Sequence, residues 1–346
     1  MKIVILPSLW WSKIDAQAEK EATPPGDFPR RMMRWLEADG HEIKVIEPTE
    51  GRLNPYPNQS FLRGLDPLRA VKAVAGAARD ADIVVSTFEA GAVGLLALRH
   101  LAFFKPKIAL WEFNPDPDWA VRTRIQHFIT PKLDLVMVLD ETQKEYLEKL
   151  DKPPRRIEVI GAHVDEEFYS PAPEMRRPRR VLAVGNDVGR DFETFFSAVD
   201  GMDAEVVVVS QIIAGPTPAN VEIVADYVPF PAFRDHYRSA EVVAVPLKPA
   251  LHPGGVSTVT EAMACGSAVV VSESPGIQSF VRHGETAHVV PAGNPAALRA
   301  GIELVLNDAA YAERLRRNAR AEMTGRLSQR AFAKRFEDAL QKAVND

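Results

Sequence analysis

The chain has 346 residues, 46% of them hydrophobic and 26% charged, with a formal net charge of -5 and an isoelectric point near 6.0. This length predicts two α/β domains rather than one core, and the acidic balance argues against a nucleic-acid-binding protein. No apolar run is long enough to predict a membrane span, and Cys265, the single cysteine, excludes an intrachain disulfide and a cysteine-rich metal site. Because the N-terminus also lacks a signal-peptide layout, we expect a cytoplasmic enzyme.

Short β-branched runs alternate with helical stretches along the whole chain, a pattern typical of parallel sheets with helix crossovers. In the first half, a helix is expected over Pro29–Asp39, with Gly40 as its C-terminal stop. Six strands are expected there, at Lys2–Leu6, Glu42–Ile46, Ile83–Thr87, Ile108–Trp111, Leu135–Leu139 and Arg156–Ile160.

A change of composition marks Ser170–Arg179, where SPAPEMRRPR holds three prolines and three arginines and predicts an interdomain linker. We therefore expect an N-terminal Rossmann-like domain over 1–169, the linker over 170–179 and a C-terminal Rossmann-like domain over 180–325. Residues 326–346 have apolar side chains at helical spacing and are expected to form a helix that can pack back on the N-terminal domain.

After the linker the alternation restarts. Strands are expected at Arg180–Val184, Ala204–Ser210, Val221–Ile223, Val242–Pro246, Ala268–Ser272 and Ala287–Val290. Helices are expected at Asp191–Val199, Pro231–Ser239, Val256–Cys265, Ile277–His283, Pro295–Asn307 and Ala309–Met323. Two such α/β domains predict a ligand site in the cleft between them, at the carboxyl ends of the strands.

The most informative segment follows an apolar run ending in VPLKP and begins HPGGVSTVTEAMACG. Gly254 and Gly255 stand just before a predicted helix, where a backbone without side chains lets a ligand reach free N–H groups and the helix dipole favours phosphate. Ser257 and Thr258 either donate hydroxyls to that ligand or cap the helix. Glu261 lies four residues after Ser257 on the same face, where its carboxylate suits a ribose diol; a solvated helix glutamate is the alternative.

This segment resembles the donor-binding signature of the GT-B retaining glycosyltransferases of family 4, the glycosyl transferases group 1. The resemblance rests on GG, EAMACG, AVVVSESPG and VRHGETAHVVPAGN, and it continues through PAALRAGIELVLND. Upstream, HVDEEFYSP resembles the end of the family's first domain. The resemblance implies two Rossmann-like domains facing across a cleft.

The resemblance also implies an activity, namely transfer of a sugar from a nucleoside-diphosphate sugar to an acceptor hydroxyl with retention of configuration. The donor nucleotide is expected to be UDP or GDP, used as a co-substrate, with no metal and no other cofactor. The acceptor is expected to be a glycan, a lipid-linked molecule or a small molecule.

Roles follow only where residues match the family. Glu261 matches the second glutamate of a paired motif, which typically binds the ribose hydroxyls. The turn from Gly254 through Gly255, Val256 and Ser257 to Thr258 matches the backbone that meets the donor sugar and the distal phosphate.

The loop GNDVGRDF matches the family's diphosphate loop, where an arginine is usually followed by a lysine. It begins at Gly185, Asn186 occupies the arginine position, and Arg190 lies close to the lysine position. Arg190 is therefore the expected diphosphate clamp, because a fixed guanidinium fork suits paired phosphate oxygens. A surface arginine beside Asp191 is the alternative. Arg190 and Glu261 are the residues expected to carry catalysis.

The sequence departs from the family pattern on the sugar and acceptor side. Pro253 replaces the first glutamate of the pair, and His252 or Lys248 could substitute for it, unless both are solvated loop residues. The histidine often found after the family's fourth strand is also missing. Glu112 and Asn114 are the polar candidates near the sugar there.

Two other functions stay open. One is a nucleotide-sugar epimerase or an inverting transferase on the same fold, and the other is a non-catalytic nucleotide-sugar-binding subunit. The mixed apolar and basic segment Leu95–Lys107, with Arg30, Arg31 and Arg34, could contact the inner face of a membrane peripherally. A core helix with a solvated basic end is the alternative for that segment.

Overall fold

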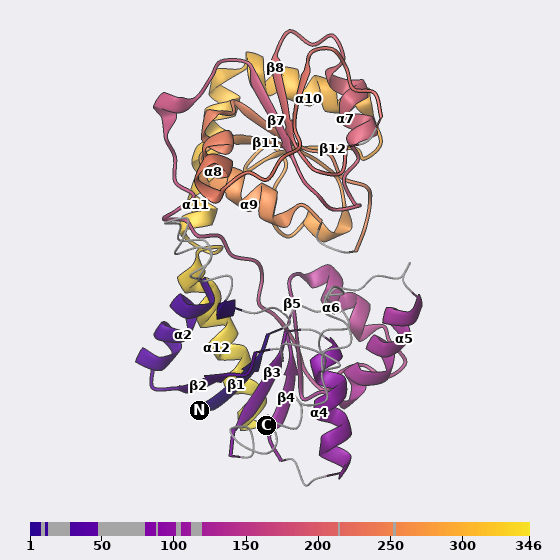
Figure 1. Ribbon diagram of the computed structural model, residues 1–346, viewed down its shortest axis with the longest axis vertical. Helices are drawn as coiled ribbons and strands as arrows, with labels where there is room; N and C mark the ends of the chain where they lie inside the picture. The colour runs from indigo at the N-terminus through magenta and orange to yellow at the C-terminus, as the bar shows by residue number, and fades with distance from the viewer. Residues whose placement is uncertain are drawn as a thin grey trace. The chain divides into compact units, whose positions relative to one another are not determined.

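The chain forms two compact units, shown as a computed structural model in Figure 1. The first holds the described residues up to Gly161 together with Phe332–Asp346, and the second holds Ala162–Ala331. The segment 170–179, predicted to be a linker, lies within the second unit, where Arg176 Nη2 donates to the carbonyl oxygen of Gly266 at 2.9 Å. The structure describes residues 1–7, 11–12, 28–47, 80–87, 89–101, 105–111, 120–213, 215–251 and 254–346.

The first unit is built on a parallel six-stranded sheet of order β2-β1-β3-β4-β5-β6. Its strands, each overlapping a predicted one, are β1 (Lys2–Leu6), β2 (Glu42–Val45), β3 (Ile83–Ser86), β4 (Lys107–Leu110), β5 (Leu135–Val138) and β6 (Ile157–Val159). Its helices are α2 (Phe28–Ala38), α4 (Glu89–Leu101), α5 (Ala120–Ile129), α6 (Glu141–Glu148), the 3-10 turn η4 (Thr130–Lys132) and α12 (Gln329–Asn345).

Helices cover both faces of this sheet, which explains why its strands are almost continuously apolar. Successive strand residues point to opposite faces. Ile3 and Ile5 pack in one core with residues of α2 and α12, while Val4 and Leu6 pack in a second core with residues of α4 and α6. The sheet is therefore the middle layer of three.

The last helix, α12, contributes to the core of the first unit. Phe332 and Phe336 are buried against the sheet, and the ring of Trp111 lies 4.9 Å from that of Phe336. Lys342 Nζ on the same helix donates to Glu158 Oε2 at 2.9 Å. Trp111 is thus a core residue.

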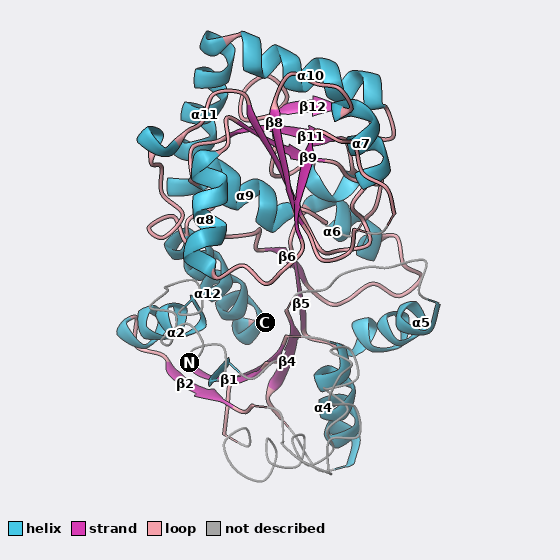
Figure 2. Cartoon of the chain, turned by 45° about the horizontal axis from the view of Figure 1, so that its top comes forward, coloured by secondary structure: helices cyan, strands magenta, loops and turns pink. Residues whose placement is uncertain are grey.

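The second unit has a parallel sheet of order β12-β11-β10-β7-β8-β9. Its strands are β7 (Arg180–Val184), β8 (Glu205–Val209), β9 (Val221–Val224), β10 (Val242–Val245), β11 (Ala268–Ser272) and β12 (His288–Val290). Its helices are α7 (Phe192–Val199), α8 (Phe230–Ser239), α9 (Val256–Ala264), α10 (Pro295–Asn307) and α11 (Ala309–Thr324), with the 3-10 turns η5 (Pro173–Met175) and η6 (Pro275–Ile277). Helices again flank both faces (Figure 2).

Strand order creates one special place in this second sheet. The chain lays β8 and β9 on one side of β7, and then returns to lay β10, β11 and β12 on the other side. The connection that leaves β7 therefore leads to one edge of the sheet, and the connection that leaves β10 leads to the other edge. In open α/β sheets such a reversal is where ligands bind.

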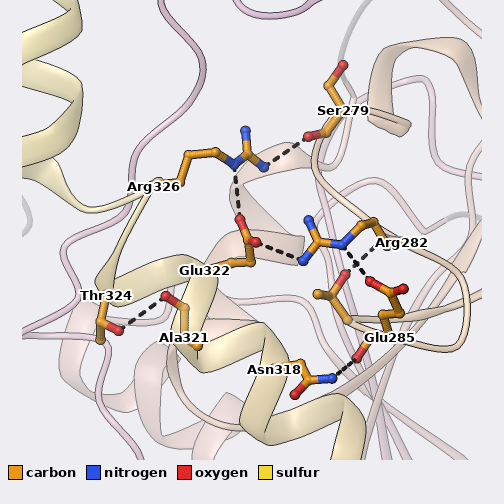
Figure 3. A network of polar contacts seen from close by, with 9 residues as sticks. Ser279, Arg282, Glu285, Asn318, Ala321, Glu322, Thr324 and Arg326 are labelled. Atoms are coloured by element: carbon orange, nitrogen blue, oxygen red, sulfur yellow. Dashed lines mark hydrogen bonds and ion pairs between the residues drawn. The ribbon is translucent and has the colours of Figure 1, made fainter.

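The helix predicted over Ile277–His283 does not form, because η6 ends at Ile277 and turns follow. Arg282 N donates to Thr286 Oγ1 at 2.9 Å while Thr286 N donates to Arg282 O at 3.0 Å, which closes a turn. The Arg282 side chain donates to Glu322 Oε1 on α11 at 2.7 Å, and Arg326 Nε donates to Glu322 Oε2 at 3.0 Å (Figure 3). These contacts with α11 fix the segment as a turn.

Candidate functional site

Two loops meet at the carboxyl edge of the second sheet, one after β7 and one after β10. A single antiparallel bridge joins Arg190 of the first loop to Leu247 of the second. Lys248 N also donates to Gly189 O at 2.9 Å. The second loop leads directly into α9, so the first loop is held beside the N-terminus of that helix.

Arg190 is buried here, with 6% of its surface exposed. Its Nη2 donates to Thr258 Oγ1 at 2.8 Å, and its Nε lies 3.0 Å from Asp187 Oδ2 in an ion pair. Nη1 has no hydrogen-bond acceptor within the described part of the chain, and the contact of Nε with Asp187 does not have hydrogen-bond geometry. The alternative of a surface arginine is therefore wrong.

The charge of Arg190 is paired with the half-buried carboxylate of Asp187. Burial lowers the pKa of its guanidinium from the usual value, and the carboxylate of Asp187 opposes that effect. A guanidinium nevertheless stays protonated in proteins. A buried cation with free N–H groups favours an anion that can accept hydrogen bonds from it.

Two glycines make room for this side chain. A Cβ on Gly185 would stand 1.9 Å from Arg190 Nε, and a Cβ on Gly255 would stand 2.6 Å from Arg190 Nη1. Gly255 also has a φ of +84°, which side chains other than glycine rarely adopt. The guanidinium position therefore requires glycine at both places.

The N-terminus of α9 faces the same space. Gly255 is its N-cap residue, and no side chain in the described ranges caps it. The first N–H groups of a helix have no acceptor within the helix, so those of Val256, Ser257 and Thr258 can meet an anion. Ser257 is exposed, and the hydroxyl of Thr258 is occupied by Arg190. Helix capping by these two residues, one of the two sequence interpretations, is not seen.

Glu261 lies on α9 and is partly buried. Its Oε2 accepts a hydrogen bond from Tyr237 Oη at 2.9 Å, and the hydroxyl of Tyr169 interacts with the same carboxyl. Burial raises the pKa of Glu261 to about 7, although the two hydroxyls and the charge of Arg190 act in the opposite direction. The alternative of a solvated helix glutamate is therefore wrong.

A pocket of about 170 Å³ lies beside Asn186, across the ends of β7, β8 and β9. Asn186 Oδ1 accepts from Gln211 N at 2.7 Å, which ties two of these loops together. Tyr227 is 62% exposed at the pocket. The pocket is lined by Asn186, Val209, Ser210, Gln211, Asp226, Tyr227, Val228, Phe230 and Phe233.

Sequence reasoning missed this pocket and the two tyrosines at Glu261. The pocket residues come from the ends of β7, β8 and β9 and from α8, so no single motif contains them. Tyr169 does lie in the HVDEEFYSP segment that drew attention, and Tyr237 follows Pro231 on the predicted helix, but neither position signals contact with Glu261.

Of the remaining candidates, the structure describes Lys248. Lys248 is exposed and contributes its backbone N–H to the loop. His252, Glu112 and Asn114 lie outside the described residues, as does Pro253. In the described ranges, no group of three or more His, Cys, Asp or Glu side chains is placed to hold a metal ion.

The segment considered for membrane contact is partly a core element. Leu95 and Leu96 of α4 are buried in the first unit, and Arg99 Nη2 pairs with Asp134 Oδ2. No helix in the described part of the chain is long and apolar enough to cross a membrane.

The second unit contains the part of the chain that matches a known protein family. Residues 219–322 match the family model described as Glycosyl transferases group 1. The match includes α9 and Glu261 but not the loop that carries Arg190. A 98-residue stretch is 33% identical to an uncharacterized glycosyltransferase of Methanocaldococcus jannaschii, covering 28% of this chain and 24% of that relative. Residues 219–322 of the second unit are therefore similar to a glycosyl transferases group 1 domain.

Solved structures resemble the whole chain. Sucrose-phosphate synthase from Thermosynechococcus elongatus superposes with a TM-score of 0.76 at 17% identity, over 99% of each chain. The fold is GT-B. A second GT-B protein, HepE from Anabaena in complex with UDP-glucose, superposes with a TM-score of 0.71 at 14% identity, over 99% of this chain and 100% of that one.

Proposed function

We propose that this GT-B chain is a glycosyltransferase that moves a sugar from a nucleoside-diphosphate sugar to an acceptor hydroxyl. The observation that carries the proposal is the buried guanidinium of Arg190, with Nη1 free of acceptors among the described residues, beside the N-terminus of α9. A diphosphate would supply acceptor oxygens to the guanidinium N–H groups and to the N-terminus of α9. The UDP-glucose bound to HepE supports a UDP donor, and GDP is the alternative.

The other parts of the site suit the rest of such a donor. The carboxyl of Glu261 suits the ribose diol, and the pocket at Asn186 and Tyr227 suits the base. The turn at Gly254 and Gly255 suits the distal phosphate and the sugar. The acceptor, a glycan, lipid-linked or small molecule, would be taken up by the first unit.

Transfer breaks the bond between the anomeric carbon and the diphosphate oxygen, and forms a bond from that carbon to the acceptor oxygen. The acceptor proton passes to the departing phosphate on the same face, which retains the configuration. Arg190 and the N–H groups of α9 would stabilise the charge that develops on the leaving diphosphate. This countercharge comes from the protein, so the proposal includes no metal ion.

The first test is thermal unfolding with UDP, GDP, ADP, TDP and CDP. A diphosphate present at about one hundred times its dissociation constant adds about 2.7 kcal/mol to the free energy of unfolding. We expect one diphosphate to stabilise the wild type and to lose that effect in Arg190→Gln and Glu261→Gln. If none stabilises the wild type, the proposed function is wrong.

Turnover separates a transferase from the other functions. With the sugar form of the stabilising nucleotide, a transferase gives a glycosylated product only when an acceptor is present. An epimerase changes the donor without an acceptor, and a binding subunit changes nothing.

A further inference from the structure

Two tyrosine hydroxyls converge on the one carboxyl of α9. Tyr237, on α8, is fully buried, and its Oη donates to Glu261 Oε2 at 2.9 Å. Tyr169, from the chain segment before β7, is 4% exposed and directs its hydroxyl to the same carboxyl. The rings of the two tyrosines lie 6.3 Å apart at 71°, edge to face. One side of the carboxyl is therefore enclosed by donors.

The segment that carries Tyr169 is firmly held within the second unit. Arg320 of α11 donates from Nη1 to the carbonyl oxygens of Tyr169 at 2.9 Å and Ala264 at 2.7 Å. Its Nη2 donates to Glu166 O at 2.9 Å. Because Ala264 is the last residue of α9, the same guanidinium fixes the Tyr169 backbone to the helix that bears Glu261.

Burial of a tyrosine hydroxyl needs a partner, and Glu261 is the partner of both. Hydrophobic packing alone would be served by phenylalanine at either position. A carboxylate offers about four acceptor positions on its two oxygens, so two donors leave room for further donors. Glu261 is only partly buried, and the charge of Arg190 also acts on its carboxyl.

We propose that Tyr169 and Tyr237 are positioning residues that hold Glu261 and direct its free acceptor positions to the ribose hydroxyls of the nucleotide. The proposal rests on the proposed function for its ligand. It assigns the hydroxyls a role beyond packing, namely keeping a buried carboxyl in its ionised, accepting form when ribose binds.

The charged and titratable neighbours of Glu261 define how this is measured. They are Tyr237 from α8, Tyr169 from the preceding segment, Arg190 from the loop after β7, and Cys265 at the end of α9. Of these, both tyrosines and Arg190 favour the ionised carboxylate. Removal of either hydroxyl should therefore move the titration of Glu261 to higher pH.

The first experiment needs no nucleotide. Urea unfolding of the full chain is followed from pH 4.5 to 9, each protein being compared with its own Glu261→Gln counterpart. The free energy of unfolding of the wild type minus that of Glu261→Gln should fall with rising pH. It should level off near pH 7, where the carboxyl ionises in the folded state. In Tyr169→Phe and Tyr237→Phe, the pH at which this difference becomes constant should rise by about one unit. Tyr311→Phe, which removes a hydroxyl 2.9 Å from His288 Nδ1, is the control and should not move it.

The second experiment measures affinity for UDP and for its 2′,3′-dideoxy analogue. Both phenylalanine variants should weaken UDP binding about tenfold and leave the analogue unchanged, since it lacks the ribose hydroxyls. Equal weakening of both ligands, or no weakening of UDP, would overturn the ribose role. An unmoved levelling pH in both variants would overturn the positioning role. If the wild type binds none of UDP, GDP, ADP, TDP or CDP, the proposed function fails while the titration still decides whether the tyrosines set the ionisation of Glu261.

Discussion

The two sheets of this chain follow the same rules of construction but bury opposite charges at their carboxyl edges. In the first unit these are carboxylates: Glu89 follows β3 and accepts from Gln126 Nε2 at 2.5 Å, and Asp140 follows β5 and caps α6 by accepting from Gln143 N at 2.8 Å. In the second unit the buried charge is Arg190, after β7. Strand order and apolar runs are shared, so they do not explain this difference.

The comparison teaches that the anion site comes from a few residues in two loops. Burial raises the pKa of Asp140 to about 6, so this carboxyl is mostly ionised only above that pH. Arg190, Gly185 and Gly255 distinguish the edge of the second sheet, where the diphosphate is proposed to bind.

The largest expected effect tests the cation itself. Arg190→Gln should weaken binding of the nucleoside diphosphate at least about 100-fold, because a buried charge-assisted contact to phosphate is lost. The free energy of unfolding should change by less than about 1 kcal/mol, because the cost of burying the cation is also removed. Isothermal titration and urea unfolding measure the two quantities.

Arg299→Gln is the matched control for that prediction. Arg299 lies on α10 and pairs with Glu303 Oε1 at 3.0 Å, away from the loops after β7 and β10. Its replacement should leave nucleotide affinity unchanged. A comparable loss of affinity in both variants would mean that nucleotide binding does not depend specifically on Arg190.

The second prediction tests the room around the guanidinium. Gly255→Ala should weaken nucleotide binding about 10- to 100-fold, because its Cβ would stand 2.6 Å from Arg190 Nη1. Gly293→Ala is the control, since Gly293 has a φ of +68° and no atom near its added Cβ. Both should lose about 1 kcal/mol of stability from backbone strain, yet only Gly255→Ala should lose binding. Equal affinities of the two variants would show that the space left by Gly255 for Arg190 does not determine nucleotide binding.

The third prediction concerns the buried carboxyl of the second unit. Glu261→Gln should weaken nucleotide binding about tenfold. Because the folded-state pKa of Glu261 is raised from 4.5 to about 7, the wild type loses stability as pH rises between those values. The variant should therefore be more stable than the wild type by about 2 kcal/mol at pH 8 and show little gain at pH 4.5. A gain that is independent of pH would contradict the assignment.

The smallest effect is expected in the first unit. Asp140→Asn keeps a capping oxygen and removes a buried charge whose Oδ2 has no partner in the described part of the chain. Stability should rise by about 1 kcal/mol at pH 8 and not at pH 4, since the folded-state pKa is about 6. Nucleotide affinity should not change, and a change would show that the two edges are not independent.

Local patterns in the sequence gave most of the fold. Each strand of both sheets overlaps a predicted strand, and the inner strands are mostly apolar because both of their faces are covered. The helix predicted over Ile277–His283 does not form, because Arg282 and Thr286 close a turn and Arg282 contacts Glu322 of α11. A local pattern of residues does not reveal these contacts. The glycine pair before α9 was also visible, because a turn and the helix that follows it are neighbours along the chain.

The sequence by itself determined the alternation of elements, the glycine turn before α9 and the choice of Arg190 and Glu261 as candidates. Only the tertiary structure decided that Arg190 is buried between Gly185 and Gly255, and that two tyrosines enclose Glu261. The reason is the pairing of β7 with β10, which brings together loops far apart in the chain. Burial, and with it the pKa of Glu261, arises from that long-range packing and from no local pattern of residues.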